Sequence, residues 1–222
     1  MNFSIKTAAL GLLLLGFAAC KKDFTNPNAA TQEETFASDR AATAVAAGLQ
    51  RQYTAGAASS LYALVNANGF VTNELILRNA GNIPELQLST GGPAVDATNS
   101  VLANVWTRSN KIIYDAHNVI RFANTLGDRS YASGLISFAS IFKALSIGNM
   151  AMLWERIPDT TGANVNFISR VDGFRKAVTV LNSAIAVYNA ATPNGLVMSR
   201  LPAGINIPNT LQALKARYSL YA

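Results

Sequence analysis

The single cysteine of the chain, Cys20, stands in a sequence that is typical of a lipid-acylation site. Lys6 supplies a positive charge, and residues 7–17 form an apolar run that is far shorter than the ~20 residues of a membrane-spanning helix. The small residues Ala18 and Ala19 then precede the cysteine, as signal cleavage requires. We therefore expect residues 1–19 to be a lipoprotein signal peptide and Cys20 to become an acylated, membrane-anchored N-terminus. The alternative is an ordinary secretory signal that happens to end in a cysteine.

The single histidine, His117, limits the catalytic chemistry that is available. Ser-His-Asp and Cys-His systems need a histidine as the base, but His117 lies in a helical pattern with Ile113 and Val119, which favours a packed or surface position. The sequence also contains neither a glycine-rich nucleotide-binding motif nor His-Glu-x-x-His. We therefore expect no catalytic residues, no cofactor and no metal site.

Acidic residues leave one enzymatic alternative open. Glu74 paired with Glu85 or with Asp96 would supply the two carboxyl groups of a glycoside hydrolase. The sequence does not fix the distance between these groups, and unrelated acids in a loop are the simpler interpretation. A glycoside hydrolase is therefore the less favoured function.

Charge argues against a nucleic-acid partner. The chain has 18 Lys and Arg and 12 Asp and Glu, a net charge of +6, and cleavage after Ala19 would leave +5. The basic residues are scattered, without a basic run or alternation with aromatic residues, so we expect no nucleic-acid binding.

Because the chain has a single cysteine, a disulfide within the chain is excluded.

Residues beyond the predicted signal peptide divide into a tether and a helical domain. Residues 20–30 have no periodicity and predict an extended lipidated tether, and residues 31–222 are expected to form one domain. Thr31 and Glu34 match a capping box, after which Phe36, Val45, Leu49 and Tyr53 recur at helical spacing. A shorter apolar group at residues 61–65 continues this helix or begins another.

Residues 66–99 are rich in asparagine, glycine and proline, and they predict the longest irregular stretch of the chain. Long loops in globular domains are usually functional or disordered. We therefore expect a binding surface in this segment.

Further helices follow in close succession. A cap at Asn99 or Ser100 predicts a helix to Leu126, and residues 135–152 predict a second one, antiparallel to it. Ser169 and Asp172 predict the start of a third, and Pro208 that of a last one, whose apolar face we expect to lack its partner. Their apolar stripes are Val171, Phe174, Val178, Leu181, Ile185 and Tyr188 in the third, and Leu211, Leu214, Tyr218 and Tyr221 in the last. These patterns predict an all-α fold of tetratricopeptide-like helical hairpins with long irregular loops.

The order of these features resembles the SusD/RagB family of outer-membrane nutrient-binding lipoproteins. The resemblance covers the whole chain, although no single motif is specific. It rests on Cys20 followed by Asn26-Pro27-Asn28, on Trp106, Tyr114 and Asn118, on the segment Leu153 to Pro158, on Ser169-Arg170-Val171 with Leu181 and Ala184, and on the closing segment Ala213 to Tyr221.

The resemblance implies a function and partners. Members of this family are lipid-anchored at the cell surface, bind oligosaccharide without cleaving it, and deliver it to a SusC-like TonB-dependent outer-membrane transporter; some relatives bind peptides. The residues that match the family's ligand-contacting polar positions are Asn73, Glu74, Arg78 and Asn79. In some bacteria an aspartate directly after the acylated cysteine retains a lipoprotein at the inner membrane. This chain has Lys21 at that position, so we expect it at the outer membrane.

Two departures from the family bear on ligand binding. Glu155-Arg156 stands where members often have Gly-Asp, and members are usually about twice as long, so the chain resembles the N-terminal half of a SusD-like fold, truncated at its C-terminus. We expect such a fragment to bind sugar weakly. Trp106 and Trp154, which could stack on a sugar ring, are interpreted as packing residues because Trp106 shares the helical stripe of Leu102 and Val105.

Overall fold

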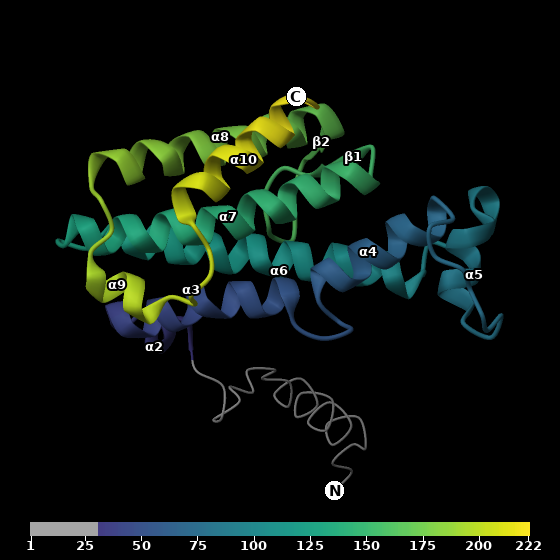
Figure 1. Ribbon diagram of the computed structural model, residues 1–222, viewed down its shortest axis with the longest axis horizontal. Helices are drawn as coiled ribbons and strands as arrows, with labels where there is room; N and C mark the ends of the chain where they lie inside the picture. Colours follow the sequence, from purple (N-terminus) through teal and green to yellow (C-terminus); the bar gives the residue numbers. More distant parts are fainter. Residues whose placement is uncertain (1–30) are drawn as a thin grey trace, which may run out of the picture. The chain divides into compact units, whose positions relative to one another are not determined.

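Helices make up most of the structure, a computed structural model that describes residues 31–222 (Figure 1). The predicted all-α fold class is confirmed. Residues 35–222 group together as one unit. The predicted signal peptide, the tether and Cys20 lie outside the described residues. The finer prediction of tetratricopeptide-like stacking stays a prediction.

The first predicted helix is divided in two. The capping box is confirmed: the Thr31 backbone N–H donates to Glu34 Oε2 at 2.8 Å, and the Glu34 N–H donates to Thr31 Oγ1 at 3.2 Å. It starts only the short α2 (Gln32–Thr35). Ser38 is extended and accepts a hydrogen bond from Ala41 N, and so it begins a second helix, α3 (Asp39–Thr54).

The centre of the unit is an antiparallel pair of long helices, α6 (Ser100–Ala123) and α7 (Arg129–Leu153), which run side by side in Figure 1. Asn99 Oδ1 accepts from the N–H groups of Val101 and Leu102 and begins α6 as predicted, and Asp128 caps α7. The most apolar window of α7 is long enough to cross a membrane, but 83% of it is buried inside the protein. It is therefore the core helix of this unit.

Residues 66–99 are more ordered than predicted. They include the end of α4 (Ser60–Val71), all of α5 (Ile83–Thr90) and a 3₁₀ turn, η1 (Gly92–Ala94). Asn68 is accommodated in α4 because its side-chain Nδ2 donates to Leu64 O, and Pro84 stands in the first turn of α5, where no helical N–H is needed. Residues 72–82, and residues 91–99 apart from η1, remain as connecting segments.

Three helices follow the central pair: α8 (Arg170–Ala190), α9 (Gly195–Arg200) and α10 (Ile207–Ser219). Ser169 Oγ accepts from Asp172 N, which confirms the predicted start of α8. The predicted stripe was wrong at its first residue, because Val171 is 38% exposed. The deepest residues of α8 instead include two alanines, and they are Phe174, Ala177, Leu181 and Ala184.

The last helix, α10, has a partner within the unit. It packs on α8 and α7, and its Ile207, Leu211 and Tyr218 are buried. The expectation that its apolar face lacks a partner was therefore wrong, and the exposed apolar residues nearby are Leu220 and Tyr221 beyond its end. The short α9, which the sequence patterns did not predict, precedes it.

A small hairpin interrupts the helices between α7 and α8. β1 (Arg156–Pro158) pairs antiparallel with β2 (Phe167–Ser169), and Pro158 lies opposite Phe167. Ile157 is 1% exposed, and a side chain on Gly173 of α8 would overlap it. The hairpin is therefore fastened to the core by one face, and residues 159–166 project from it as a loop.

Candidate functional site

Three aromatic side chains from separate elements gather beside this hairpin. Trp106 comes from α6, Trp154 follows the last residue of α7, and Phe167 lies on β2. The rings of Trp106 and Phe167 are nearly parallel, at 14° with centroids 6.2 Å apart, and Trp154 meets Trp106 edge-on at 5.1 Å. Trp106 and Trp154 are half-buried and Phe167 is 44% exposed, so the group keeps a face in contact with solvent.

The hairpin register explains why Phe167 joins this group. Side chains alternate between the faces of a strand, so Ile157 and its partner Ile168 share one face and pack toward the core. Pro158 and Phe167, which are opposite each other, share the other face with Arg156. This second face lines two neighbouring clefts.

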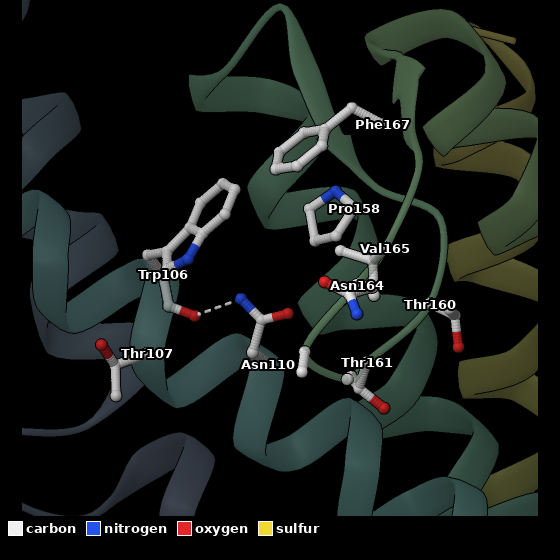
Figure 2. A pocket seen from close by; sticks show the side chains of 11 residues that line it. Trp106, Thr107, Asn110, Pro158, Thr160, Thr161, Asn164, Val165 and Phe167 are labelled. Atoms are coloured by element: carbon white, nitrogen blue, oxygen red, sulfur yellow. Dashed lines mark hydrogen bonds between the residues drawn. The ribbon is translucent and has the colours of Figure 1, made fainter.

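The first cleft, of about 610 Å³, lies between α6 and the loop of the hairpin. In Figure 2 the rings of Trp106, Phe167 and Pro158 surround the same space as the amides of Asn110 and Asn164. Asn110 Nδ2 donates to the Trp106 backbone carbonyl at 3.0 Å, which orients its amide. The remaining lining residues are Thr107, Thr160, Thr161, Gly162, Ala163 and Val165.

A second cleft, of about 600 Å³, shares Trp106, Thr107 and Phe167 with the first. Trp154, Asp96 and Arg156 line it as well. The Arg156 guanidinium donates to the Phe167 carbonyl at 2.9 Å and is thereby held beside the aromatic rings. Hydrogen bonds from the side chain and then the backbone of Thr98 lower the pKa of Asp96, which keeps this carboxyl ionised.

The four polar residues predicted to contact ligand lie elsewhere. Asn73, Glu74, Arg78 and Asn79 are exposed on the segment between α4 and α5, and none of them lines either cleft. Asn73 has a left-handed backbone conformation, φ 58°, directly after the end of α4, and Asn79 Oδ1 accepts from Gly81 N at 2.9 Å. The observed contacts of Asn73 and Asn79 shape the chain, and the ligand role of all four stays a prediction.

The titratable residues considered for catalysis are dispersed. Asp96 is the one carboxylate among the residues that line the two clefts, and neither Glu74 nor Glu85 is there. His117 is exposed on α6; partial desolvation, and then the charges of Lys143 and Arg121, lower its pKa. Within residues 31–222 no group of three or more His, Cys, Asp or Glu side chains is placed to hold a metal ion.

Sequence patterns identified only part of this site. They singled out Trp106 and Trp154 as packing residues, and both do pack against the core while they also line clefts. Phe167 was missed because strands of three residues are too short to show an alternating pattern. Asn110 on α6 and Asn164 in the hairpin loop were missed because neither belongs to a recognisable motif. The available signal was the pair of short groups Arg156-Ile157-Pro158 and Phe167-Ile168-Ser169 around a segment rich in Thr, Gly and Asn.

Comparison of the chain with protein-family models, with curated proteins and with solved structures finds no match. The resemblance to the SusD/RagB family therefore stays a prediction from the sequence.

Proposed function

We propose that the chain is a lipid-anchored, non-catalytic oligosaccharide-binding protein of the outer-membrane surface that delivers its ligand to a SusC-like TonB-dependent transporter. The observation that supports binding most directly is the position of Trp106. One half-buried indole, flanked by Phe167 and Trp154, lines both clefts.

Oligosaccharide suits the chemistry of these clefts. The C–H faces of a pyranose ring pack on aromatic rings, and its hydroxyl groups exchange hydrogen bonds with amides, carboxylates and guanidinium groups. Trp106 and Phe167 provide the rings, Asn110 and Asn164 the amides, and the Asp96 and Arg156 side chains the charged groups. A ligand with several sugar rings would contact both clefts across the shared indole.

The state of Asp96 supports binding rather than hydrolysis. A glycosidase general acid needs a raised pKa so that it stays protonated, and it needs a second carboxyl group about 5 to 10 Å away. The hydrogen bonds from Thr98 shift the pKa of Asp96 in the opposite direction. Its carboxylate is therefore better suited to accept hydrogen bonds from sugar hydroxyls.

Binding is tested by calorimetry of the full chain against a panel of oligosaccharides and short peptides, with product analysis of each mixture. We expect heat of binding from at least one oligosaccharide and no cleavage. Asn164→Ala should weaken binding, whereas Asn166→Ala, an exposed residue of the same loop that lines neither cleft, should not. Cleavage of a sugar would establish the hydrolase alternative, and binding of peptides alone would establish the peptide-binding alternative.

The predicted ligand residues on the 72–82 segment are tested in the same titrations. If they contact the sugar, Arg78→Ala and Asn79→Ala will weaken binding while Asn164→Ala has no effect. That result would place the site away from Trp106 and overturn the assignment of the two clefts.

Anchorage is tested separately from binding. Cys20→Ala should shift the protein from the membrane fraction to a soluble or uncleaved form, because it removes the sulfur that carries the lipid. Protease treatment of intact cells then reports whether the anchored chain faces outward. Unchanged fractionation of the Cys20→Ala variant would contradict lipidation.

A further inference from the structure

Two arginines meet at the end of the unit where α3 begins. Arg40, in the first turn of α3, and Arg200, the last residue of α9, line an open pocket of about 440 Å³ together with Thr43 and Ala44. Arg200 Nη1 lies 3.3 Å from Asp39 Oδ2, so the start of α3 and the end of α9 are neighbours, as Figure 1 also shows. Both guanidinium groups therefore belong to one end of the unit.

Arg200 is held in place by a chain of hydrogen bonds with a fixed direction. Its guanidinium donates to the Tyr131 hydroxyl at 3.0 Å, and the Thr43 hydroxyl donates to the Asp39 carbonyl at 2.7 Å. The Tyr131 hydroxyl must then donate to Thr43 Oγ1, 2.6 Å away, because Thr43 has already used its only proton. The guanidinium of Arg200 is thus held in one position by the buried side chains of Tyr131 and Thr43.

The two carboxylates beside these arginines, Asp39 and Asp128, already have partners within the protein. Asp39 is paired with Arg200, and Asp128 accepts hydrogen bonds from Tyr131 N and Asn194 Nδ2. Within the described part of the chain, the Arg40 guanidinium has no hydrogen bond or ion pair. Arg40 is also exposed, so its charge is available to an anion from outside.

Apolar side chains stand beside these charges. Leu196 is 51% exposed and Met198 is 41% exposed, although both belong to the six-residue α9. Val197 between them is buried, and a side chain on Gly134 of α7 would overlap it, so α9 is fixed against the core by its inner side. Exposed apolar residues with arginines around them are typical of surfaces that lie in a membrane interface.

The connection to the anchor places this end within reach of the membrane. Cys20 precedes Asp39 by nineteen residues, and an extended chain of that length spans at most about 65 Å. Since α3 is the first long helix of the unit, the chain that comes from Cys20 enters the unit at this end. The end of the unit that carries Arg40, Leu196 and Met198 is thus the part with the shortest chain path to Cys20.

We propose that the surface formed by Arg40, Leu196, Met198 and Arg200, the α9 face, rests on the anionic lipid surface of the membrane that holds Cys20. Arg40 and Arg200 contact lipid phosphates, and Leu196 and Met198 enter the boundary between headgroups and acyl chains. The proposal rests on the proposed lipid anchor. It also orients the unit, because α5 and the opposite end then point away from the membrane.

The test places a fluorescent probe at each end of the unit in the lipidated protein. Ser199→Cys puts a thiol on the exposed side of α9, and Thr90→Cys puts one on α5 at the opposite end. Once Cys20 is acylated, each variant has one free thiol for an environment-sensitive dye. Each protein is reconstituted into vesicles of phosphatidylcholine alone, or with phosphatidylglycerol added, and lipid-attached quenchers report contact.

We expect a shift to shorter wavelength and strong quenching at position 199 with phosphatidylglycerol, a smaller response with phosphatidylcholine alone, and none at position 90. Arg40→Gln should reduce the contact equilibrium about fivefold, as expected for one arginine at an anionic surface, and high salt should act in the same direction. Arg108→Gln, a half-buried arginine of α6, is the matched control and should have no effect.

Flotation of the same vesicles separates this proposal from the anchor. Protein that does not float with the vesicles overturns the anchor, and the membrane contact of the α9 face with it. Protein that floats while the probes at positions 199 and 90 respond alike overturns only the contact. Oligosaccharide binding is unaffected by either result, because both clefts lie at the hairpin.

Discussion

The phenyl ring of Phe167 lies nearly parallel to the indole of Trp106, at 14° and 6.2 Å, although the two residues are sixty-one positions apart in the sequence. One belongs to a two-stranded hairpin and the other to a central helix. Because the hairpin is anchored through Ile157, the position of Phe167 relative to Trp106 is set by the core.

Phe167→Ala tests whether this aromatic pair binds ligand. The side chain is 44% exposed, so the free energy of unfolding should fall by only about 1 kcal/mol or less. Affinity for the oligosaccharide should fall about tenfold, because a stacking face is lost from both clefts. Titration calorimetry and urea unfolding measure the two effects. Tyr62→Ala on α4, with 49% exposure, is the matched control and should leave affinity unchanged.

Gly148→Ala should destabilise the fold because the ring of Tyr218 fills the space where a Cβ of residue 148 would lie. We expect a loss of roughly 1 to 3 kcal/mol, as for other overpacked cores. Gly48→Ala in α3 meets nothing within 4 Å and should instead stabilise by about 0.5 to 1 kcal/mol. Thermal unfolding of the two variants compares them, and equal effects would show that Tyr218 does not occupy this position.

Two buried tyrosines should respond differently to loss of their hydroxyl groups. Tyr53 OH accepts from Asn149 Nδ2 at 3.0 Å, whereas the Tyr218 hydroxyl has no hydrogen-bond partner among the described residues. Tyr53→Phe leaves a buried amide unpaired and should cost about 1 to 3 kcal/mol. Tyr218→Phe should be neutral or stabilising at pH 7. Urea denaturation that gave the reverse order would contradict these contacts.

Stability should fall at alkaline pH. Burial raises the pKa of both phenols above that of unfolded tyrosine, which is about 10, and at Tyr218 the nearby Tyr53 adds to the shift. Below pH ~10 the two neutral phenols therefore make their full contribution to the free energy of unfolding. As the pH rises from there toward the higher folded pKa, the free energy of unfolding falls by up to about 1.4 kcal/mol per pH unit for each tyrosine. Tyr218→Phe should make this decline shallower in unfolding measurements between pH 9 and 12.

Two alanine variants on α8, Leu181→Ala and Val171→Ala, test whether the buried face is the one in the structure or the stripe predicted from the sequence. Leu181 is fully buried, so its truncation should cost about 2 to 5 kcal/mol. Val171 belongs to the same predicted stripe but is 38% exposed, and its truncation should cost under about 1 kcal/mol. If urea denaturation showed similar losses in the free energy of unfolding for both variants, the stripe predicted from the sequence would be favoured.

Local signals predicted the long helices well. Capping residues such as Asn99 and Ser169 act within three residues of their own position, so their effect can be read without knowing the rest of the fold. Val171 was wrong because helical periodicity marks a face and does not say how far the neighbouring helix extends. In α8 the alanines Ala177 and Ala184 are fully buried along with Leu181, on a helix against which both α7 and α10 pack.

The candidate site was less accessible to prediction because distant segments build it. Whether Trp106 packs inside or lines a cleft depends on where Phe167 lies, and that depends on the pairing of Pro158 with Phe167. Such pairing over eight intervening residues leaves little local pattern. Composition identified residues 66–99 as irregular, but two helices there are stabilised by contacts that composition does not show, such as Asn99 Nδ2 with the Pro84 carbonyl at 2.9 Å.

The central place of α7 has a consequence for the order in which the chain folds. The apolar faces of α3 and α6 are completed by α7, which comes after them in the sequence, and α8, α9 and α10 also pack on it. During synthesis the N-terminal segment therefore has no finished core until residues 129–153 have emerged.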